Sequence, residues 1–561
     1  MSTVGGASRD VSYAQLLADV RSFAGSLRAM GVRAGDRVLL YMPMVPEAAV
    51  AMLACARIGA VHSVVFGGFA ARELAVRIDD AAPKVVIAAT CGLEGAKGAI
   101  PYMPAVDAAI DEAARKPDHV VVVRRGEAAA AGVAYDLKAG RDRDFAALVA
   151  DRGVEADCAV LKSADPLYTI YTSGTTGDPK GILRDNSHAA MLKWTMGEFY
   201  GCGPDETMFA ASDIGWVVGH SYIVYGPLLH GATSVMFEGK PVGTPDAATY
   251  WRIVEASKCS TMFTAPTALR AIRKFDPDGA ALANHDLSSL RALFVAGERA
   301  DPDTVQHFEK VLGIPVVDHW WQTESGSPMT GVQLEDVGTR LGSCGLALPG
   351  YDMKVLDDAG AEVAANEMGS IAIKLPLPPG FMTTLYNNEA RFKSAYLDDF
   401  PGYYSAGDAG FRDDDGYLHI MTRTDDIINV AGHRLSTGAL EEACSEHPMV
   451  VECAVVGAAD ALKGTVPVAL IVTSGPSETV VDDVVALVRD KIGAFAALKS
   501  CAVVAALPKT RSGKILRKAI RAMADGDDTY KLPGTIEDAS VVEDDVRPAL
   551  ASLGYPKAAE H

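Results

Sequence analysis

Short apolar runs alternate with amphipathic stretches from the N-terminus to residue 295. In residues 11–31, apolar side chains such as Val20 and Phe23 recur every three or four positions, which predicts a helix that ends at Gly31. The predicted strands that follow are 38–41, 61–66, 84–89, 120–123, 168–171, 233–237, 261–264 and 293–295. Apolar strands separated by helices are typical of parallel sheets covered on both faces. We therefore expect an α/β fold with doubly wound parallel sheets.

The pattern changes near residue 335. Glycine-punctuated short strands at 351–356, 370–374 and 416–421 predict a small β-barrel-like region. After residue 425, helices at 438–447 and 480–492 alternate with strands at 451–456, 466–472 and 501–504, which predicts a small α+β domain. We therefore expect a large domain over 1–424, a C-terminal domain over 425–525 and a tail over 526–561. The Ala-rich residues 126–140, with 141–144, predict a surface insertion without a function of its own.

Composition narrows the class of protein. The chain carries 52 Lys and Arg residues against 72 Asp and Glu residues, a formal net charge of −20, whereas broad nucleic-acid binding needs a basic face. Its nine cysteines include no CxxC pair, which argues against a zinc ribbon or a disulfide scaffold. No apolar run is long enough to span a bilayer, and the first ten residues lack an apolar signal core. We expect a cytoplasmic enzyme that binds neither nucleic acid nor membranes.

Residues 171–181 form the most informative segment, because three glycines, several hydroxyl side chains and Lys180 follow a predicted strand there. Backbone N–H groups near glycine, together with Ser and Thr hydroxyls, can surround phosphate oxygens, and the lysine supplies positive charge. The segment is no GxxxxGK[ST] loop, since Pro179 stands five residues after Gly174. A flexible surface turn is the alternative; the pattern favours a phosphate loop.

This segment resembles the phosphate-binding loop of adenylate-forming enzymes, the superfamily of acyl-CoA synthetases, peptide-synthetase adenylation domains and luciferases. Further motifs that resemble the family follow in its order at 318–326, 404–408, 423–434 and 508–514. The sequences Trp-Trp-Gln-Thr-Glu and Gly-His-Arg-Leu are similar to the short-chain branch, most of all to propionyl-CoA synthetases and next to acetyl-CoA synthetases. The resemblance runs from about residue 11 to about residue 525.

The resemblance implies a reaction in two halves. A carboxylate first attacks the α-phosphate of ATP to give an acyl-adenylate and pyrophosphate, and the thiol of CoA then displaces AMP. The first half brings an anion against a polyanion, so it requires cationic side chains and Mg²⁺ rather than a protein nucleophile. ATP and CoA are thus the expected co-substrates, beside a small carboxylic acid.

Three residues are implied to be catalytic. Lys514 matches the lysine that bridges the carboxylate and the α-phosphate, Glu324 matches the acid that holds Mg²⁺ against the phosphates, and Thr323 matches a phosphate contact. A solvated surface charge is the alternative for Lys514, and a helix-capping carboxylate the alternative for Glu324. The resemblance also implies that a lysine acetyltransferase and a deacetylase act on Lys514.

The implied ATP site is larger. Asp408 matches the carboxylate that accepts both ribose hydroxyls. At Arg299 the sequence departs from the family, which usually has proline after the glutamate. The residues that match the ATP site are Thr172, Ser173, Gly174, Thr175, Thr176, Gly177, Lys180, Gly297, Glu298, Arg299, Asp318, His319, Trp320, Trp321, Gln322, Thr323, Asp408, Arg423 and Arg434.

Domain rotation and CoA binding are implied by further matches. Asp425 matches the hinge about which the small, mobile C-terminal domain rotates between the two half-reactions. The residues that match the CoA site are Gly67, Lys97, Ala431, Gly432 and Arg489. Glu94 stands where acetate-type members carry an arginine, so its charge opposes the 3′-phosphate of CoA.

The acyl pocket departs from the acetate type. Val217, Val218, Ala296 and Trp321 match its walls; acetate-type members have Thr at the position of Val218 and Val at the position of Ala296. This exchange makes room for about one extra carbon, and one methylene changes specificity by about 10–200-fold. Propionate is therefore the expected acid, with acetate, butyrate, isobutyrate, acrylate and 3-hydroxypropionate as alternatives. An adenylation domain that serves a carrier protein and an inactive binding module are the competing functions.

Overall fold

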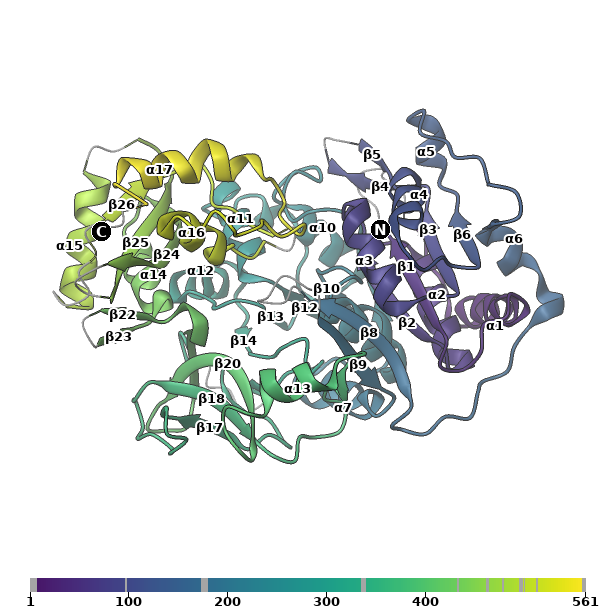
Figure 1. Ribbon diagram of the computed structural model, residues 1–561, viewed down its shortest axis with the longest axis horizontal. Helices are drawn as coiled ribbons and strands as arrows, with labels where there is room; N and C mark the ends of the chain where they lie inside the picture. Colours follow the sequence, from purple (N-terminus) through teal and green to yellow (C-terminus); the bar gives the residue numbers. More distant parts are fainter. Residues whose placement is uncertain are drawn as a thin grey trace.

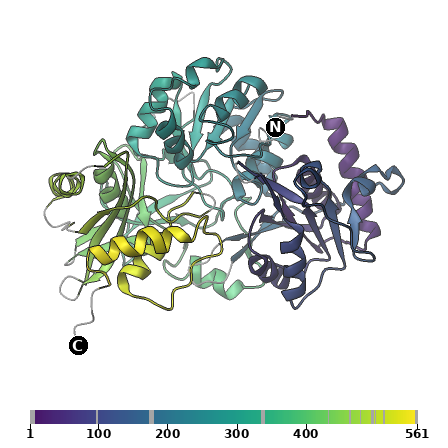
Figure 2. The same ribbon diagram turned by 90° about the horizontal axis from the view of Figure 1, so that it is seen from above.

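The computed structural model describes residues 8–95, 98–172, 180–333, 340–430, 433–460, 464–476, 479–493, 498, 500–510 and 513–556 of the 561-residue chain. Figure 1 shows the C-terminal region with α15 at one end of the long axis and the first sheet, with β1 and β3, at the other. From above, the second sheet and its helices form a further lobe between these two regions (Figure 2).

The first sheet has eight strands in the order β19-β9-β8-β2-β1-β3-β6-β7. Its strands are β1 (Arg37–Met42), β2 (Val61–Phe66), β3 (Val85–Ala89), β6 (His119–Val123), β7 (Asp142–Asp144), β8 (Pro166–Thr172), β9 (Lys180–Asp185) and β19 (Thr384–Leu385). The strands from β8 to β7 along this order pair in parallel, whereas β9 pairs antiparallel with β8 and β19 antiparallel with β9. The sheet is therefore mixed at one edge.

Helices cover both faces of this sheet, which confirms the doubly wound prediction. Along β1, Val38 and Leu40 pack with α1 and α2 in one apolar cluster, whereas Leu39 and Tyr41 pack with α3 and α4 in another. Successive strand side chains point to opposite faces, so both sides must be apolar when both are covered. The helices around this sheet are α1 (Tyr13–Ala29), α2 (Pro46–Ile58), α3 (Ala71–Ala81), α4 (Met103–Glu112), α5 (Gly126–Ala130), α6 (Phe145–Ala150), the 3-10 helix η2 (Arg152–Val154), α7 (His188–Trp194) and α13 (Glu389–Tyr396).

The second sheet is entirely parallel, in the order β11-β10-β12-β13-β14. Its elements are β10 (Thr207–Ala210), β11 (Thr233–Ser234), α10 (Thr249–Ser257), β12 (Thr261–Thr264), α11 (Pro266–Phe275), η5 (Leu282–Asn284), β13 (Ala292–Val295), α12 (Pro302–Leu312) and β14 (Val316–Asp318). One face packs around Trp251 and Phe308, while Phe263 and Phe294 on the other face join the core of the first sheet. The two sheets therefore share a core.

Short helices fill the space between the two sheets. They are the π-helices η3 (Thr195–Phe199) and η4 (His220–Tyr225) with α8 (Val217–Gly219) and α9 (Gly226–His230). Two short strand pairs and an antiparallel sheet in the order β17-β18-β20-β21 complete the large domain. The strands are β4 (Cys91–Glu94) with β5 (Gly98–Pro101), β15 (Thr330–Gly331) with β16 (Leu346–Ala347), and β17 (Met353–Leu356), β18 (Gly369–Lys374), β20 (Tyr403–Arg412) and β21 (Leu418–Arg423).

The C-terminal region is built on its own sheet, which follows the 3-10 helix η7 (Thr424–Asp426). Its elements are β22 (Ile428–Val430), β23 (His433–Leu435), α14 (Thr437–Ser445), β24 (Val450–Asp460), β25 (Gly464–Thr473), α15 (Val480–Lys491), β26 (Ser500–Val503), α16 (Arg517–Asp525), the π-helix η9 (Val542–Val546) and α17 (Arg547–Ser552). Val546, Leu550 and Tyr555 lie in an apolar cluster with β24 and β25. The described part of the segment expected to be a tail is thus packed against this sheet.

Two sequence expectations differ from the structure. The run 233–237 forms a strand only at Thr233–Ser234. Residues 141–144, expected on a surface insertion, instead include the edge strand β7. Asp142 is buried there and accepts hydrogen bonds from the Tyr135 hydroxyl at 2.8 Å and from the Lys138 backbone N–H at 2.9 Å. The run of charged residues predicted solvent exposure, and nothing in the sequence indicated that Asp142 is buried and accepts hydrogen bonds from the preceding loop.

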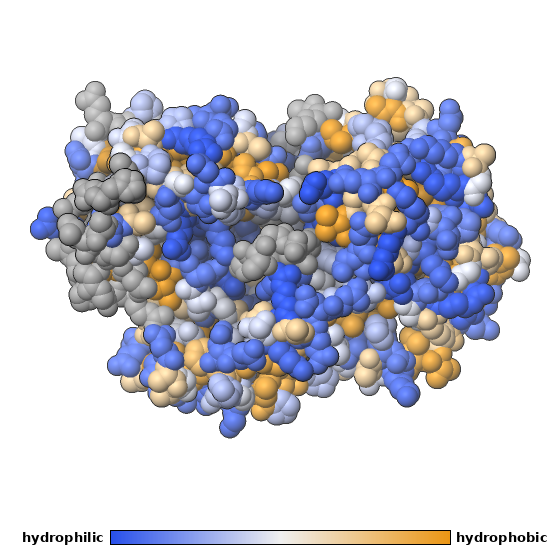
Figure 3. Space-filling model, viewed as in Figure 1, coloured by the Kyte–Doolittle hydropathy of each residue, from blue (hydrophilic) through white to orange (hydrophobic). Residues whose placement is uncertain are grey.

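The surface and the thiols agree with the composition. Figure 3 shows a largely hydrophilic face on which apolar side chains appear in small separate groups. Within the described ranges, no helix combines the length and the apolar character that crossing a membrane requires. All nine cysteines are free thiols, and Cys158 is the exposed one.

Candidate functional site

Several of the predicted ATP and acyl-pocket residues lie at the carboxyl ends of β13 and β14. These strands are parallel neighbours with Val295 beside Asp318, so the segments 296–299 and 319–324 leave the same edge of the sheet. Ligands of parallel α/β sheets bind at this edge. The strands β8, β9 and β20 approach it from the other parts of the large domain (Figure 1).

Gln322 and Asp408 form the first polar group of the site. The Gln322 amide donates to the Asp408 carboxylate at 2.6 Å, and the Tyr404 hydroxyl donates to the Gln322 carbonyl oxygen at 2.9 Å. Arg423 lies 3.4 Å from the same carboxylate. Burial raises the pKa of Asp408, while the Arg423 charge and the Gln322 hydrogen bond oppose this shift. The structure therefore brings together three residues that are far apart in sequence and that were all predicted.

Glu324 and Lys180 form the second group, together with Tyr396 from α13. The Tyr396 hydroxyl donates to the Glu324 carboxylate at 2.7 Å, and the Lys180 ammonium lies 5.0 Å from the centre of the Tyr396 ring. Burial lowers the pKa of Lys180, and the nearby cations Arg391 and Arg423 act in the same direction, whereas Glu324 opposes them. The sequence pattern pointed to Glu324 and Lys180 but not to Tyr396, which no motif marks.

Arg184 on β9 holds the backbone of this group, and the sequence analysis did not predict it either. Its side chain is fully buried, and its guanidinium donates to the backbone carbonyls of Thr323, of Glu324 at 3.0 Å and of Gly380. The Tyr168 hydroxyl accepts a further hydrogen bond at 3.2 Å. A buried arginine is costly unless its N–H groups are satisfied, and here carbonyl oxygens satisfy them. An arginine inside the apolar run 181–184 was the available signal.

The segment 297–299 divides its contacts between the two domains. Gly297 has φ +101°, a conformation that favours glycine. The Glu298 carboxylate accepts from the Thr267 N–H at 2.6 Å, from the Thr267 hydroxyl and from Arg270 at 2.9 Å. Arg299 points instead to α14, where it contacts Glu442 at 2.6 Å and the Gly438 carbonyl at 3.2 Å. The departure from the family pattern thus carries an interdomain contact.

The four residues predicted for the acyl pocket share one apolar cluster. Val217, Ala296 and Trp321 are buried, and Val218 is half-buried against them. The Trp321 ring stands edge-on to the Tyr222 ring, with centroids 5.6 Å apart.

The His319 imidazole and the Tyr200 ring pack in the same cluster, next to Trp321. The His319 Nε2 atom lies 3.1 Å from the Tyr200 hydroxyl, and burial lowers the pKa of His319 to about 3, so its imidazole is neutral. Asp318, which is partly buried, has its pKa raised by desolvation. Trp320 is half-buried and packs against the same core.

The predicted CoA residues are not brought together in this arrangement. Gly67 lies against Tyr102, since a Cβ atom at position 67 would be 2.4 Å from the Tyr102 hydroxyl. Arg489 is exposed on α15, which lies at one end of the long axis, whereas α3, which follows Gly67, lies beside the first sheet (Figure 1). Lys97, Ala431 and Gly432 lie outside the described residues.

Part of the predicted phosphate loop lies outside the described residues too. These are Ser173, Gly174, Thr175, Thr176 and Gly177. Its two ends are described, with Thr172 paired to Lys180 between β8 and β9. The Tyr171 hydroxyl donates to Asp80 at 2.6 Å, which ties the start of the loop to α3. Arg434 lies in β23 opposite Asn429.

The Lys514 loop contacts the large domain beside Glu298. A Cβ atom at Gly513 would be 3.1 Å from the Thr267 side chain. Lys514 is exposed, its backbone carbonyl accepts from the Thr510 N–H at 2.8 Å, and its own N–H donates to the Thr510 hydroxyl at 3.1 Å. The loop that carries the predicted catalytic lysine therefore lies at the domain boundary next to α11.

The predicted hinge residue Asp425 is held by cations. Its carboxylate lies 2.7 Å from the Lys518 ammonium and 3.7 Å from Arg423, and its backbone carbonyl accepts from Arg521 at 3.3 Å. Burial would raise the pKa of Asp425, but the Lys518 contact outweighs it, so the pKa is lowered. In the part of the chain that the structure describes, no group of three or more His, Cys, Asp or Glu side chains could hold a metal ion.

Comparison with known proteins identifies the family. The family model described as AMP-binding enzyme matches residues 2–385, and the one described as AMP-binding enzyme C-terminal domain matches residues 439–514. The chain is 47% identical over 551 residues to the mitochondrial acyl-CoA synthetase short-chain family member 3 of Rattus norvegicus, with 96% of this chain and 80% of that protein covered. It is 45% identical over 556 residues to the propionate–CoA ligase of Escherichia coli (strain K12), with 97% and 87% covered.

A solved structure has the same fold. The acetoacetyl-CoA synthetase of Streptomyces lividans superposes with a TM-score of 0.86 at 22% identity, with 98% of this chain and 83% of that chain covered. The two family matches, the two relatives and the arrangement of the motifs at the strand ends agree. The chain belongs to the AMP-binding enzyme family and, within it, to the short-chain acyl-CoA synthetases.

Proposed function

We propose that this protein joins propionate to coenzyme A, with cleavage of ATP to AMP and pyrophosphate. The observation that carries the choice of acid is that Ala296, directly after β13, is buried in the same apolar core as Val217 and Trp321, against which Val218 also packs. Ala296 leaves the space of two methyl groups that valine would fill, and Trp321 limits the depth. The similarity to the propionate–CoA ligase of Escherichia coli supports the same choice.

The chemistry proceeds in two displacements. An oxygen of the propionate carboxylate attacks the α-phosphorus of ATP, the bond to pyrophosphate breaks, and propionyl-adenylate forms. The sulfur of CoA then attacks the acyl carbon, its proton is lost to solvent, and AMP leaves with the electron pair of the broken C–O bond. Lys514 is assigned to balance the charge that gathers in the first displacement, and the 172–180 loop, Lys180 and Thr323 to hold the phosphates.

The remaining predicted ATP-site residues are assigned to the ribose and the adenine. Asp408, supported by Gln322 and Arg423, is assigned to the ribose hydroxyls, because a carboxylate can accept two hydrogen bonds. The segments 297–299 and 318–322 are assigned to the two sides of the adenine, and Arg434 to the ribose or phosphates. In this assignment Arg299 contributes its backbone, since its side chain is engaged with Glu442.

Mg²⁺ fits the donors at this site. Glu324 offers a carboxylate beside Lys180, and Mg²⁺ in nucleotide enzymes is bound by one or two carboxylates, phosphate oxygens and water. When bound, the cation would neutralise part of the phosphate charge. Glu324 would bind it, and Tyr396 orients the Glu324 carboxylate.

CoA binding requires a second domain arrangement. We assign Gly67, Lys97, Ala431, Gly432 and Arg489 to CoA after rotation of the domain that begins near Asp425. Figure 1 supports this assignment, because α3 lies beside the first sheet and α15 at the far end of the C-terminal region, so CoA would contact both Gly67 and Arg489 only after such a rotation. Glu94 then lies on the CoA side as a charge that Lys97 and Arg489 must offset.

Separation of nucleotides after incubation tests the proposal. The protein is incubated with ATP, Mg²⁺, CoA and one acid from acetate, propionate, butyrate, isobutyrate, acrylate and 3-hydroxypropionate. We expect AMP in every active reaction, with propionate the best acid and acetate slower by about 10–200-fold. ADP in place of AMP would overturn the mechanism, and acetate ahead of propionate would overturn the substrate.

The same assay separates the competing functions. Acyl-adenylate formation without transfer to CoA would favour an adenylation domain that serves a carrier protein, and absence of any nucleotide product would favour a binding module. We further propose that acetylation of Lys514 silences the first half-reaction. Enzymatic acetylation of Lys514 is expected to abolish propionate-dependent exchange of pyrophosphate into ATP and to spare thioester formation from supplied propionyl-adenylate, whereas equal loss of both would contradict this role.

A further inference from the structure

Arg299 links the nucleotide edge of the large domain directly to the C-terminal domain. Its Nη2 atom lies 2.6 Å from a carboxylate oxygen of Glu442, and its Nη1 atom donates to the Gly438 carbonyl at 3.2 Å. Both partners belong to α14. The Arg299 and Glu442 side chains are 21% and 33% exposed, so water and salt screen this pair less than a fully exposed one.

The start of α14 lies against β21 in the same arrangement. The Ser436 hydroxyl donates to the Met421 carbonyl at 3.1 Å, and the Thr422 and Thr437 hydroxyl oxygens are 2.7 Å apart. These contacts involve segments on either side of the hinge and few residues apart in sequence. Arg299, in contrast, follows a strand of the second sheet, so its contact ties α14 to the nucleotide edge as well.

A second ion pair across the boundary provides a comparison. Lys240 and Glu537 are 2.8 Å apart, with side chains 53% and 45% exposed. Exposed pairs of this kind contribute little. The Arg299–Glu442 pair is less exposed and has a second hydrogen bond to the same helix, so it is the stronger ionic constraint of the two.

The domain arrangement that this ion pair stabilises also positions the Lys514 loop. It places Gly513 against Thr267, beside Glu298, and Lys518 near Lys180, whereas Arg489 stays at the far end of the molecule. We propose that Arg299 and Glu442 form an ionic latch that favours adenylation over thioester formation, by holding the domain arrangement in which the Lys514 loop lies at the nucleotide edge. The inference rests on the proposed two-step function. Arg299 acts through α14 and is thus a positioning residue.

The latch must open in each turnover. Rotation about the segment near Asp425 moves α14 away from the large domain and separates Glu442 from Arg299. Loss of the pair therefore lowers the population of the adenylation arrangement and does not impair the other one. A change in one half-reaction without a matching loss in the other is the signature that distinguishes a latch from a residue that only supports the fold.

The test measures the two half-reactions separately in Arg299→Met, Glu442→Gln, Arg299→Glu and the double variant Arg299→Glu with Glu442→Arg. The first assay is propionate-dependent exchange of pyrophosphate into ATP, and the second is thioester formation from supplied propionyl-adenylate and CoA. We expect Arg299→Met and Glu442→Gln to slow exchange by about fivefold and to keep thioester formation at or above the wild-type rate, the range of a modest coupling. Arg299→Glu should slow exchange more, and the double variant should restore it.

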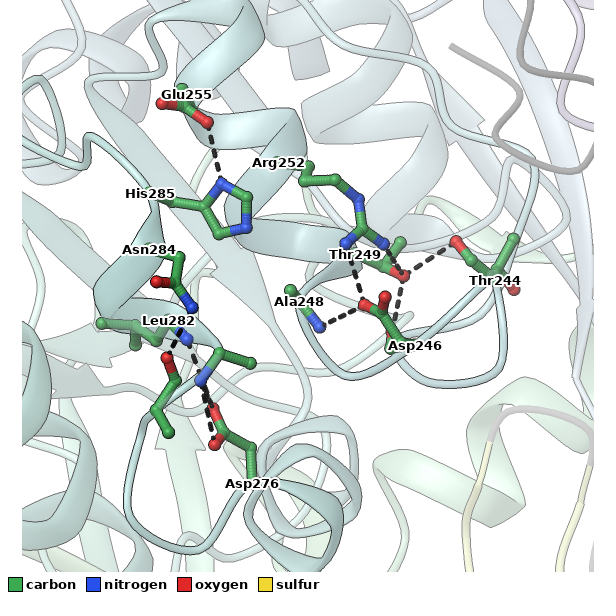
Figure 4. Close-up of polar contacts among 12 residues, drawn as sticks. Thr244, Asp246, Ala248, Thr249, Arg252, Glu255, Asp276, Leu282, Asn284 and His285 are labelled. Atoms are coloured by element: carbon green, nitrogen blue, oxygen red, sulfur yellow. Dashed lines mark hydrogen bonds and ion pairs between the residues drawn. The ribbon is translucent and has the colours of Figure 1, made fainter.

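Arg252→Met is the matched control. Arg252 forms an ion pair with Asp246 at 2.9 Å in the same domain, on the loop side of α10 shown in Figure 4. Glu255 and His285 form the neighbouring pair there, at 2.8 Å. This control removes a comparable arginine without touching α14, and both half-reactions should be unchanged. Equal loss of both half-reactions in Arg299→Met, or no recovery in the double variant, would overturn the latch.

A substrate-free measurement separates failure of the latch from failure of the proposed function. The exposed thiol of Cys158 and a cysteine introduced by Ala486→Cys on the exposed face of α15 carry a donor and an acceptor dye. Arg299→Met should shift or broaden the transfer efficiency, and the charge-swapped double variant should return it. An unchanged efficiency would overturn the latch whatever the substrate is, whereas a shifted efficiency with no propionate-dependent exchange in the wild type would overturn only the proposed function.

Discussion

The Tyr396 hydroxyl lies 2.7 Å from the Glu324 carboxylate, across 72 residues of sequence. The same tyrosine ring lies 5.0 Å from the Lys180 ammonium, so one side chain from α13 contacts both charged groups of the proposed phosphate site. The hydrogen bond restricts the carboxylate, and the ring limits where the ammonium can go. Tyr396 therefore links the helix α13 to the geometry of Glu324 and Lys180.

Replacement of this tyrosine should affect nucleotide binding rather than folding. Tyr396→Phe keeps the ring beside Lys180 and removes the hydroxyl that orients Glu324. Since a hydrogen bond to a charged group contributes about 1.5–3 kcal/mol, we expect kcat/KM for MgATP to fall by about tenfold or more. Steady-state kinetics with varied MgATP measure this. Tyr135→Phe, which removes the 2.8 Å hydrogen bond to Asp142 far from the site, is the control and should leave the KM for MgATP unchanged.

Arg184 should prove structural and functional at once. In Arg184→Met the carbonyls of Thr323 and Gly380 lose a buried donor, and each unsatisfied buried group costs about 1–3 kcal/mol. We expect a free energy of unfolding lower by about 3 kcal/mol and a lower melting temperature, with adenylation reduced further because the 323–324 backbone shifts. Urea unfolding and pyrophosphate exchange measure the two effects. An undiminished stability would show that the carbonyls find other donors.

Ala296 sets the expected selectivity. Ala296→Val fills part of the proposed acyl pocket against Trp321, so propionate should react more slowly and acetate should gain relative to it. One methylene-sized group changes the ratio of kcat/KM values by about 10–200-fold. The measurement is kcat/KM for both acids in the AMP-forming assay. A ratio equal to that of the wild type would remove position 296 from the pocket.

Asp213 gives a pH-dependent prediction. Burial raises the pKa of Asp213 to about 7, and Glu238 adds to the shift. Since the folded-state pKa exceeds that of the unfolded chain, the folded state binds more protons between pH 4 and pH 7, and stability falls as the pH rises through this range. Asp213→Asn should therefore raise the melting temperature relative to the wild type at pH 8, and the difference should shrink toward pH 4. A difference that does not vary with pH would contradict the assignment.

The sequence predicted the fold where periodicity is strong. The helix predicted over 11–31 is α1, which begins after Ser12, whose hydroxyl accepts from the Gln15 N–H, and ends shortly before Gly31, whose φ of +89° favours glycine. Strands such as β2 and β12 are short apolar runs between clear breaks. The antiparallel strands β9 and β19 were not predicted; β19, the edge strand, has only two residues, and its pairing depends on tertiary contacts.

Those site residues that stand in sequence motifs could be predicted, and the others could not. Gln322, Glu324, Asp408 and Arg423 stand in recognisable strings, and the structure brings them to one edge. Tyr396 and Arg184 stand outside any such string, and their partners are 72 and 140 residues away, so no local spacing could reveal them. The orientation of Arg299 toward α14 likewise depends on how the two domains dock, which a one-dimensional pattern does not encode.

Gly438 shows how little room the docked domains leave. A Cβ atom at this position would lie 2.0 Å from the Met421 carbonyl oxygen, closer than any real contact. In the proposed domain rotation, α14 therefore has to return to a position that tolerates no side chain at residue 438. At this point the two domains touch through backbone atoms alone. Steric exclusion at Gly438 therefore defines their relative position as much as the Arg299–Glu442 ion pair does.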